Sequence, residues 1–220
     1  MTTRYEFSLS CVTPLLMHAD NVAASDALRE WRTNPAHKSL SVAGDDRSPA
    51  WTWKAWLYSD GKHLVIPNDV LMAALRGAGA SIKIEGARGK TFKSLSQTAI
   101  TPEGEYLTLL VGGEQVRIED INAIDGTFQE HCEAVKRLGF SLFLKRIPVG
   151  RGKHIRVRPR FDDWEVRGVI GVSDGAITGT IVSMLFSIAG RERGLLDWRP
   201  SSPTTPGIYG QFTARIKQLK

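Results

Sequence analysis

The succession of hydrophobic patterns in the last third of the chain limits the fold more than any other feature of the sequence. Residues 155–160 and 164–172 alternate as strands, and Phe161-Asp162-Asp163 between them is typical of a hairpin turn. Residues 181–188 then repeat apolar side chains with the i, i+3, i+4, i+7 spacing of a helix. After a loop rich in glycine and proline, residues 212–219 alternate as a final strand. The pattern predicts strand, strand, helix and strand in this order.

The first half of the chain places a strand and a helix ahead of this pattern. Residues 4–16 alternate as a strand, residues 64–66 form a short apolar strand, and Pro67-Asn68 suits the start of a helix. Without the inserted segments, the order becomes strand, helix, strand, strand, helix, strand, which is the split βαβ arrangement. The sequence therefore predicts an α+β fold with a ferredoxin-like (RRM-like) βαββαβ core, an antiparallel sheet and inserted arms.

Two segments fall outside this core. We expect a single domain over residues 1–220, with an inserted arm at about 19–62 and a second insertion at about 83–144. The second insertion contains a capping box, Thr127 to Glu130, that predicts the start of a helix. The arm is polar and rich in tryptophan, and these side chains form either a small core of the arm or a contact with another protein. They are Trp31, Trp51, Trp53 and Trp56.

Composition favours a partner with negative charge. The chain carries 29 Lys and Arg against 23 Asp and Glu, a net charge of +6. Its two cysteines, Cys11 and Cys132, provide no disulfide framework and no structural zinc site. No apolar run approaches the roughly 18 residues that span a membrane, so we expect a cytoplasmic protein without a membrane partner. No cofactor and no metal are expected either, since no phosphate-binding loop, dinucleotide fingerprint or metalloprotease motif occurs.

The strongest local signal for function is the basic stretch from Lys145 to Arg160, which contains no acidic residue. Its last three arginines, Arg156, Arg158 and Arg160, alternate along the predicted strand and therefore point to one face of the sheet. Like charges on one face repel unless a counter-charge neutralises them, and the phosphates of a nucleic acid would do so. Local acids offer the alternative, a solvated strand face neutralised by Asp162, Asp163 and Glu165.

Two further segments extend the candidate interface. A glycine-containing loop after the first helix carries a second basic patch, which we interpret as the other side of one binding channel, or as an ordinary surface loop. Trp198 offers a stacking surface and Arg199 a phosphate contact, unless Trp198 packs the loop on the core and Arg199 pairs with Asp197. The candidate nucleic-acid-binding residues are Lys83, Arg88, Lys90, Lys93, Arg151, Lys153, Arg156, Arg158, Arg160, Trp198 and Arg199.

One histidine is the only candidate for catalysis. His18 follows the first strand and could act as the general base for attack by a ribose 2′-hydroxyl. No serine, tyrosine or second histidine is positioned by the sequence to complete such a site. We therefore interpret His18 as a structural histidine, with catalysis as the alternative.

Short motifs in a fixed order resemble a known family. They are Pro14-Leu15-Leu16-Met17-His18, Ile66-Pro67-Asn68, Gly89-Lys90-Thr91-Phe92-Lys93, Arg156 to Phe161 followed by Trp164, and Gly194 with Asp197-Trp198-Arg199-Pro200. In this order they resemble uncharacterised phage and prophage proteins that look like the RAMP superfamily, which includes the backbone subunits of CRISPR effector complexes. The resemblance implies an RRM-like core with a glycine-rich loop before the last strand. It also implies subunits that polymerise along a single strand, with inserted arms contacting their neighbours. Residues 200–206 depart from the family by interrupting its compact glycine cluster.

These observations favour a non-catalytic protein that binds single-stranded DNA or RNA with little sequence specificity. We expect it to self-associate as a homo-oligomer or filament along the strand. One alternative is a metal-independent endoribonuclease that uses His18 with a lysine or arginine to stabilise the transition state, an activity that some members of the resembled family have. Another alternative is a structural assembly protein whose basic face binds an acidic partner.

Overall fold

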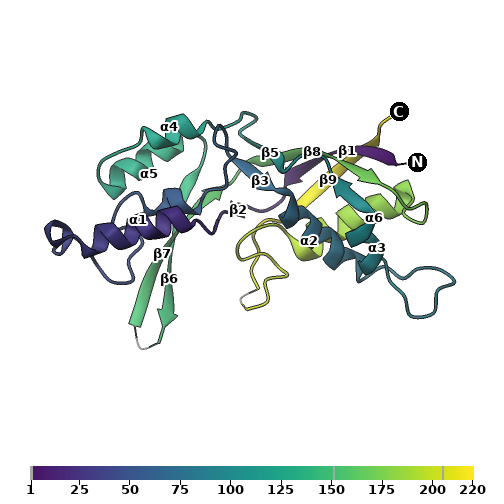
Figure 1. Ribbon diagram of the computed structural model, residues 1–220, viewed down its shortest axis with the longest axis horizontal. Helices are drawn as coiled ribbons and strands as arrows, with labels where there is room; N and C mark the ends of the chain where they lie inside the picture. Colours follow the sequence, from purple (N-terminus) through teal and green to yellow (C-terminus); the bar gives the residue numbers. More distant parts are fainter. Residues whose placement is uncertain (1, 151, 205) are drawn as a thin grey trace. The chain divides into compact units, whose positions relative to one another are not determined.

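The chain folds into two compact units, each assembled from segments that lie far apart in the sequence. The computed structural model describes residues 2–150, 152–204 and 206–220 (Figure 1). Unit 1 consists of Met1–Leu15, Val65–Gln115 and Asp162–Lys220, and unit 2 of Leu16–Leu64 and Val116–Phe161. The sequence predicts two separate insertions in one domain. Instead, the arm and the later part of the second insertion form unit 2 together, because they share one core.

Unit 1 contains an antiparallel sheet with the strand order β3-β5-β8-β1-β9, in which β4 also pairs with β8. Its strands are β1 (Thr3–Cys11), β3 (Val65–Pro67), β4 (Ile100–Pro102), β5 (Tyr106–Val111), β8 (Trp164–Val172) and β9 (Phe212–Gln218). Its helices are α2 (Asn68–Gly79), α3 (Lys93–Thr98), α6 (Gly179–Ile188) and the π-turn η3 (Ala189–Arg193). The predicted α+β class with an antiparallel sheet is confirmed.

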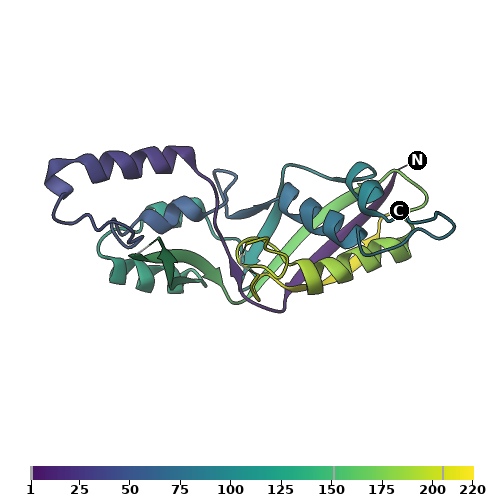
Figure 2. The same cartoon turned by 90° about the horizontal axis from the view of Figure 1, so that it is seen from below.

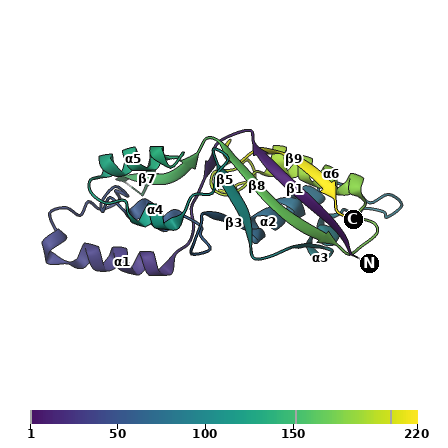
Figure 3. The same ribbon diagram turned by 90° about the horizontal axis from the view of Figure 1, so that it is seen from above.

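The core of unit 1 lies between this sheet and its helices. Figures 2 and 3, which view the molecule from opposite sides, show α2, α3 and α6 on one face of the sheet. Along β1, Phe7 and Leu9 are buried on that face, and the Phe7 ring packs on Phe186 of α6 with centroids 5.1 Å apart. The polar residues that alternate with them therefore lie on the opposite, uncovered face.

Unit 2 contains a three-stranded sheet of order β2-β7-β6 with short helices. Its strands are β2 (Leu15–Leu16), β6 (Ser141–Val149) and β7 (Gly152–Phe161). Its helices are α1 (Val22–Thr33), η1 (Pro35–His37), η2 (Thr52–Trp56), α4 (Ile118–Asn122) and α5 (Phe128–Arg137). At the start of α5, Thr127 N donates to Glu130 Oε2 at 2.7 Å and Glu130 N donates to Thr127 Oγ1 at 3.3 Å. The predicted capping box is thus confirmed.

The predicted hairpin between residues 155–160 and 164–172 is wrong. These residues form β7 and β8, which belong to different sheets, and β7 pairs instead with β6. Both segments form strands as expected, but the pattern of a strand does not specify its partner. The first part of the partner of β7, residues 141–144, lies in the segment that the sequence assigns to an insertion, and the rest belongs to the basic stretch that begins at Lys145.

Trp53 and His131 form the core of unit 2 and join its two segments. Both side chains are buried, and the Trp53 indole Nε1 donates to His131 Nδ1 at 2.9 Å. The Trp53 ring also meets Phe140 edge-on at 5.9 Å, and Phe140 stacks on Phe161 at 5.0 Å. Trp53 is therefore a core residue. For this side chain the structure agrees with a small core in the arm and not with a contact to another protein.

No helix among the described residues has the length and apolar character that crossing a membrane requires.

The hydrogen bond from Trp53 makes unit 2 sensitive to acid. Because indole only donates, His131 Nδ1 must be unprotonated. Burial lowers the pKa of His131, and the nearby Lys54 ammonium lowers it further. The unfolded chain therefore binds a proton that the folded chain excludes, and the free energy of unfolding falls as the pH drops below about 6.5.

We expect the free energy of unfolding to fall by at most about 1.4 kcal/mol per pH unit in this range. Urea unfolding between pH 8 and 5 measures it. The variant His131→Gln should have a flatter profile than the wild type below pH 6.5. Identical profiles for wild type and His131→Gln would contradict the assignment.

Candidate functional site

The arginines of β7 share one face, as predicted. Register places Arg156 opposite Lys145, Arg158 opposite Phe143 and Arg160 opposite Ser141 in the β6–β7 ribbon. Positions two apart on a strand project to the same side of the sheet. Their surroundings differ from one arginine to the next, however, and determine what each can bind.

A buried carboxylate supplies the counter-charge for two of these arginines. Asp46 is 3% exposed, and its Oδ1 accepts a hydrogen bond from Arg156 Nη1 at 2.9 Å. Its Oδ2 lies 3.7 Å from Arg158 Nη1 and accepts from Val157 N at 3.2 Å. Arg156 and Arg158 therefore share one negative charge within unit 2, which neutralises part of their combined charge.

The backbone of the arm holds Asp46 in this position. Ile155 N donates to Gly44 O at 2.8 Å, and Asp46 N donates to Ile155 O at 3.0 Å, so that the arm runs alongside β7. Gly44 has φ +76°, and a Cβ there would lie 2.6 Å from His154 Cδ2, so a side chain at this position would clash. The sequence missed Asp46, although its place in the polar run 44–48 and the absence of acids from 145–160 were the available signals.

Arg158 is part of the interior of unit 2. It is 6% exposed, its guanidinium lies 5.2 Å from the centre of the Trp56 ring, and its Nη1 donates to Val157 O at 3.0 Å. A phosphate in solvent cannot reach a group buried to this degree. Arg156 remains partly exposed beside Asp46, and Arg160 is half-buried with its guanidinium 5.8 Å from the Phe143 ring.

The outer half of the β6–β7 ribbon differs from this inner half because its cations are exposed. Lys145, Arg146 and Lys153 all have exposed side chains. They lie on both faces of the ribbon, since Lys145 pairs with Arg156 whereas Arg146 pairs with Ile155. Arg151, another candidate, lies outside the described residues.

The second basic patch belongs to unit 1. Lys83, Arg88, Lys90 and Lys93 are all exposed. Backbone hydrogen bonds close their loop, from Ile84 N to Lys90 O at 3.0 Å and from Lys90 N to Ala87 O at 3.0 Å. A surface hollow of about 700 Å³ at its base is lined by residues that include Lys90, Lys93 and Gln97. The predicted channel between this loop and the arginine strand stays a prediction.

Trp198 and Arg199, the two candidate residues in the loop before β9, make their contacts within that loop. Trp198 is half-buried and packs on Tyr209 with ring centroids 6.3 Å apart. Arg199 Nη1 donates to Leu196 O at 2.7 Å, and its Nε donates to Ser201 Oγ at 3.3 Å. Both residues thus make contacts within the loop, and Leu196 and Ser201 are the acceptors for Arg199.

His18 lies next to the buried arginine cluster. Its exposed ring meets Trp56 edge-on at 4.8 Å, and its carbonyl accepts from Tyr58 Oη at 3.3 Å. The cation that also contacts Trp56 is Arg158, which is buried and paired with Asp46. The catalytic alternative needs a cation that can reach a phosphate, and Arg158 cannot fulfil this role. Among the described residues, no group of three or more His, Cys, Asp or Glu could hold a metal ion.

The chain matches no protein-family model, and no curated protein matches its sequence.

The role of Asp46 can be tested by removing its charge alone. Asp46→Asn leaves Arg158 buried without its carboxylate, and breaking a buried ion pair in this way costs about 3 kcal/mol or more. Asp26→Asn is the matched control, because Asp26 forms an exposed pair with Arg29 at 3.1 Å, and such pairs contribute about 0.5 kcal/mol. Urea unfolding measures both. Equal effects of the two substitutions would contradict the assignment of Asp46.

Proposed function

We propose that this chain binds single-stranded nucleic acid without catalysing a reaction, through exposed cationic side chains on two basic segments. The observation that carries the proposal is the outer half of the β6–β7 ribbon (Figure 1), where Lys145, Arg146 and Lys153 are exposed. The sequence contains no Asp or Glu between residues 134 and 161. A two-stranded ribbon of this charge suits the phosphates of a nucleic acid, whose contacts dominate binding without sequence specificity.

The contacts within unit 2 change which predicted residues carry the binding. Arg156 and Arg158 share the negative charge of Asp46, and Arg199 is held within its loop. We therefore assign the phosphate contacts to side chains that are exposed to solvent. These are Arg146 and Lys153 of the ribbon, with Lys83, Arg88, Lys90 and Lys93 of the loop in unit 1.

The strand order of unit 1 supports the finer assignment of its fold. Four of its strands lie in the order β9-β1-β8-β5, all antiparallel, with α2 between β1 and β5 in sequence and α6 between β8 and β9. A ferredoxin-like βαββαβ core has this order of helices and strands. RRM domains, which bind single-stranded RNA, are built on such a four-stranded sheet. The resemblance to the RAMP superfamily points to the same core.

The proposal includes self-association along the strand, as that resemblance implies. The buried Trp53 cannot serve as the contact, but the arm offers other side chains. Helix α1 contains no buried residue, and Val22 and Leu40 are 73% and 60% exposed. Exposed apolar patches mark protein interfaces, and we assign Val22 and Leu40 to a contact with a second copy of the chain.

The ribbon is tested by the salt dependence of binding. Arg146→Gln with Lys153→Gln should reduce the log–log slope of affinity against salt by about 1.4, since each lost phosphate contact on a single strand removes about 0.7. Lys62→Gln with Lys136→Gln removes the same charge from exposed positions elsewhere in unit 2. Fluorescence anisotropy with a labelled oligonucleotide at several NaCl concentrations measures the slopes. Equal slopes for the two double variants would rule out the ribbon as the contact.

The arm is tested by light scattering on short and long oligonucleotides. Val22→Ser with Leu40→Ser should still bind a short oligonucleotide but should no longer form large assemblies on a long one. Val12→Ser with Ile208→Ser, at exposed apolar positions of unit 1, should assemble like the wild type. Persistent assembly of the folded arm variant would show that the contact lies elsewhere.

A further inference from the structure

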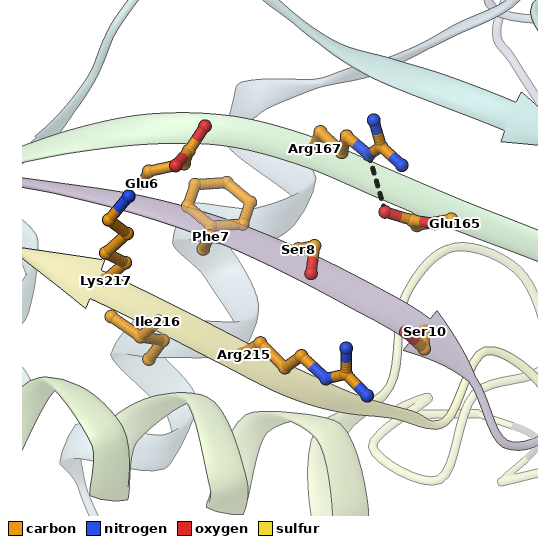
Figure 4. A pocket seen from close by; sticks show the side chains of 9 residues that line it. All are labelled: Glu6, Phe7, Ser8, Ser10, Glu165, Arg167, Arg215, Ile216 and Lys217. Carbon is orange, nitrogen blue, oxygen red and sulfur yellow. Dashed lines mark hydrogen bonds and ion pairs between the residues drawn. The ribbon is translucent and has the colours of Figure 1, made fainter.

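The uncovered face of the sheet in unit 1 carries a cluster of polar side chains that the sequence did not indicate as a site. It lies opposite the face that α2 and α6 cover, and a shallow hollow of about 410 Å³ runs over β8, β1 and β9 (Figure 4). Its polar lining comes from these three strands and includes Glu6, Ser8, Glu165, Arg167, Arg215 and Lys217.

The register of the sheet arranges these side chains in rows. Ser8 pairs with Arg167 on one side and with Arg215 on the other, so two guanidinium groups flank one hydroxyl. In the next row, Glu6 pairs with Lys217. Side chains that are directly opposite on neighbouring strands have Cβ atoms about 5 Å apart. An anion of the size of a phosphate can therefore contact more than one of these groups at once.

The cations of this face differ in their partners. Arg167 Nε donates to Glu165 Oε1 at 2.6 Å, as the dashed line in Figure 4 marks. Arg215 and Lys217 are exposed, and neither side chain has a hydrogen bond or ion pair within the part of the chain that the structure describes. Because they are two residues apart on β9, they project to the same face and repel each other. A bound anion would relieve this repulsion.

We propose that this face is a second contact surface for the phosphates of a single-stranded nucleic acid, with Arg215 and Lys217 as the cationic contacts and Ser8 as a hydroxyl donor. The proposal rests on the proposed function and extends it to unit 1. RRM sheets stack bases on aromatic side chains, whereas the row through Ser8 holds cations and a hydroxyl. The contacts are therefore to the backbone of the strand and read no sequence.

The acidic residues on the same face should weaken the binding of a phosphate, so removing their charge should strengthen it. Glu6 lies beside Lys217 and repels a phosphate that approaches it. Glu6→Gln should raise affinity about twofold or more at low salt, and the gain should vanish at high salt because ions screen exposed charges. A purely structural role of Glu6 would not strengthen binding.

The experiment compares three variants by fluorescence anisotropy with one labelled oligonucleotide across a salt series. Arg215→Gln with Lys217→Gln should lower the log–log slope by about 1.4. Arg76→Gln with Arg191→Gln is the matched control, since both residues are exposed in unit 1, on α2 and on the turn η3, and should leave the slope unchanged. Arg215→Lys with Lys217→Arg keeps both charges and should bind like the wild type.

The outcomes test the sheet face separately from the proposed role of the β6–β7 ribbon. If the ribbon variant loses affinity while the Arg215 and Lys217 variant behaves like its control, the sheet face is overturned and the proposed function stands. If the wild type binds no oligonucleotide, both are overturned. If circular dichroism shows that the double variant does not fold, Glu6→Gln becomes the deciding test. An unchanged affinity of Glu6→Gln would then overturn the proposal that the sheet face contacts phosphates.

Discussion

The buried Asp46 carboxylate determines how unit 2 is assembled and which of its cations are left to bind. A guanidinium as buried as that of Arg158 would cost several kcal/mol without a paired anion. Asp46 supplies this anion, and Asp46 can reach β7 only if the arm runs alongside that strand. The hydrogen bonds between Gly44, Asp46 and Ile155 hold the arm in this path. One ion-pair cluster therefore joins two segments separated by about a hundred residues.

This cluster also divides the basic residues into two classes. Arg156 and Arg158 are structural, because both contact the Asp46 carboxylate inside unit 2. The outer ribbon, the loop at residues 83–93 and the uncovered sheet face of unit 1 present their cations to solvent. Binding through such side chains is electrostatic, so the account requires a strong dependence on salt and little dependence on base sequence. It assigns no role in catalysis to His18, which lies beside a cation that no phosphate can reach.

Local patterns in the sequence predicted local structure well. The alternation of Tyr5, Phe7 and Leu9 and the capping box at Thr127 depend on neighbours within a few residues. The helix α6 forms as predicted, but Val182, Leu185 and Phe186 are its buried residues, and Met184 of the predicted apolar spacing is 42% exposed. The failures that change the fold and the site are long-range. Nothing within residues 155–172 distinguishes β6 from β8 as the partner of β7, and nothing near Asp46 indicates that it lies against Arg156. The uncovered sheet face was missed for the same reason, since Ser8, Arg167 and Arg215 meet only when β1, β8 and β9 pair.

The central claim is that exposed cations, and not the arginines held by Asp46, contact a single strand. Lysine footprinting by chemical acetylation and mass spectrometry, with and without a single-stranded oligonucleotide, tests it most directly because it needs no substitution in the chain. The account predicts protection of Lys153 on the ribbon and of Lys217 on the sheet face, while Lys136, exposed on α5, reacts equally in both samples. Unchanged reactivity of Lys153 and Lys217 under conditions in which the oligonucleotide is bound would contradict it.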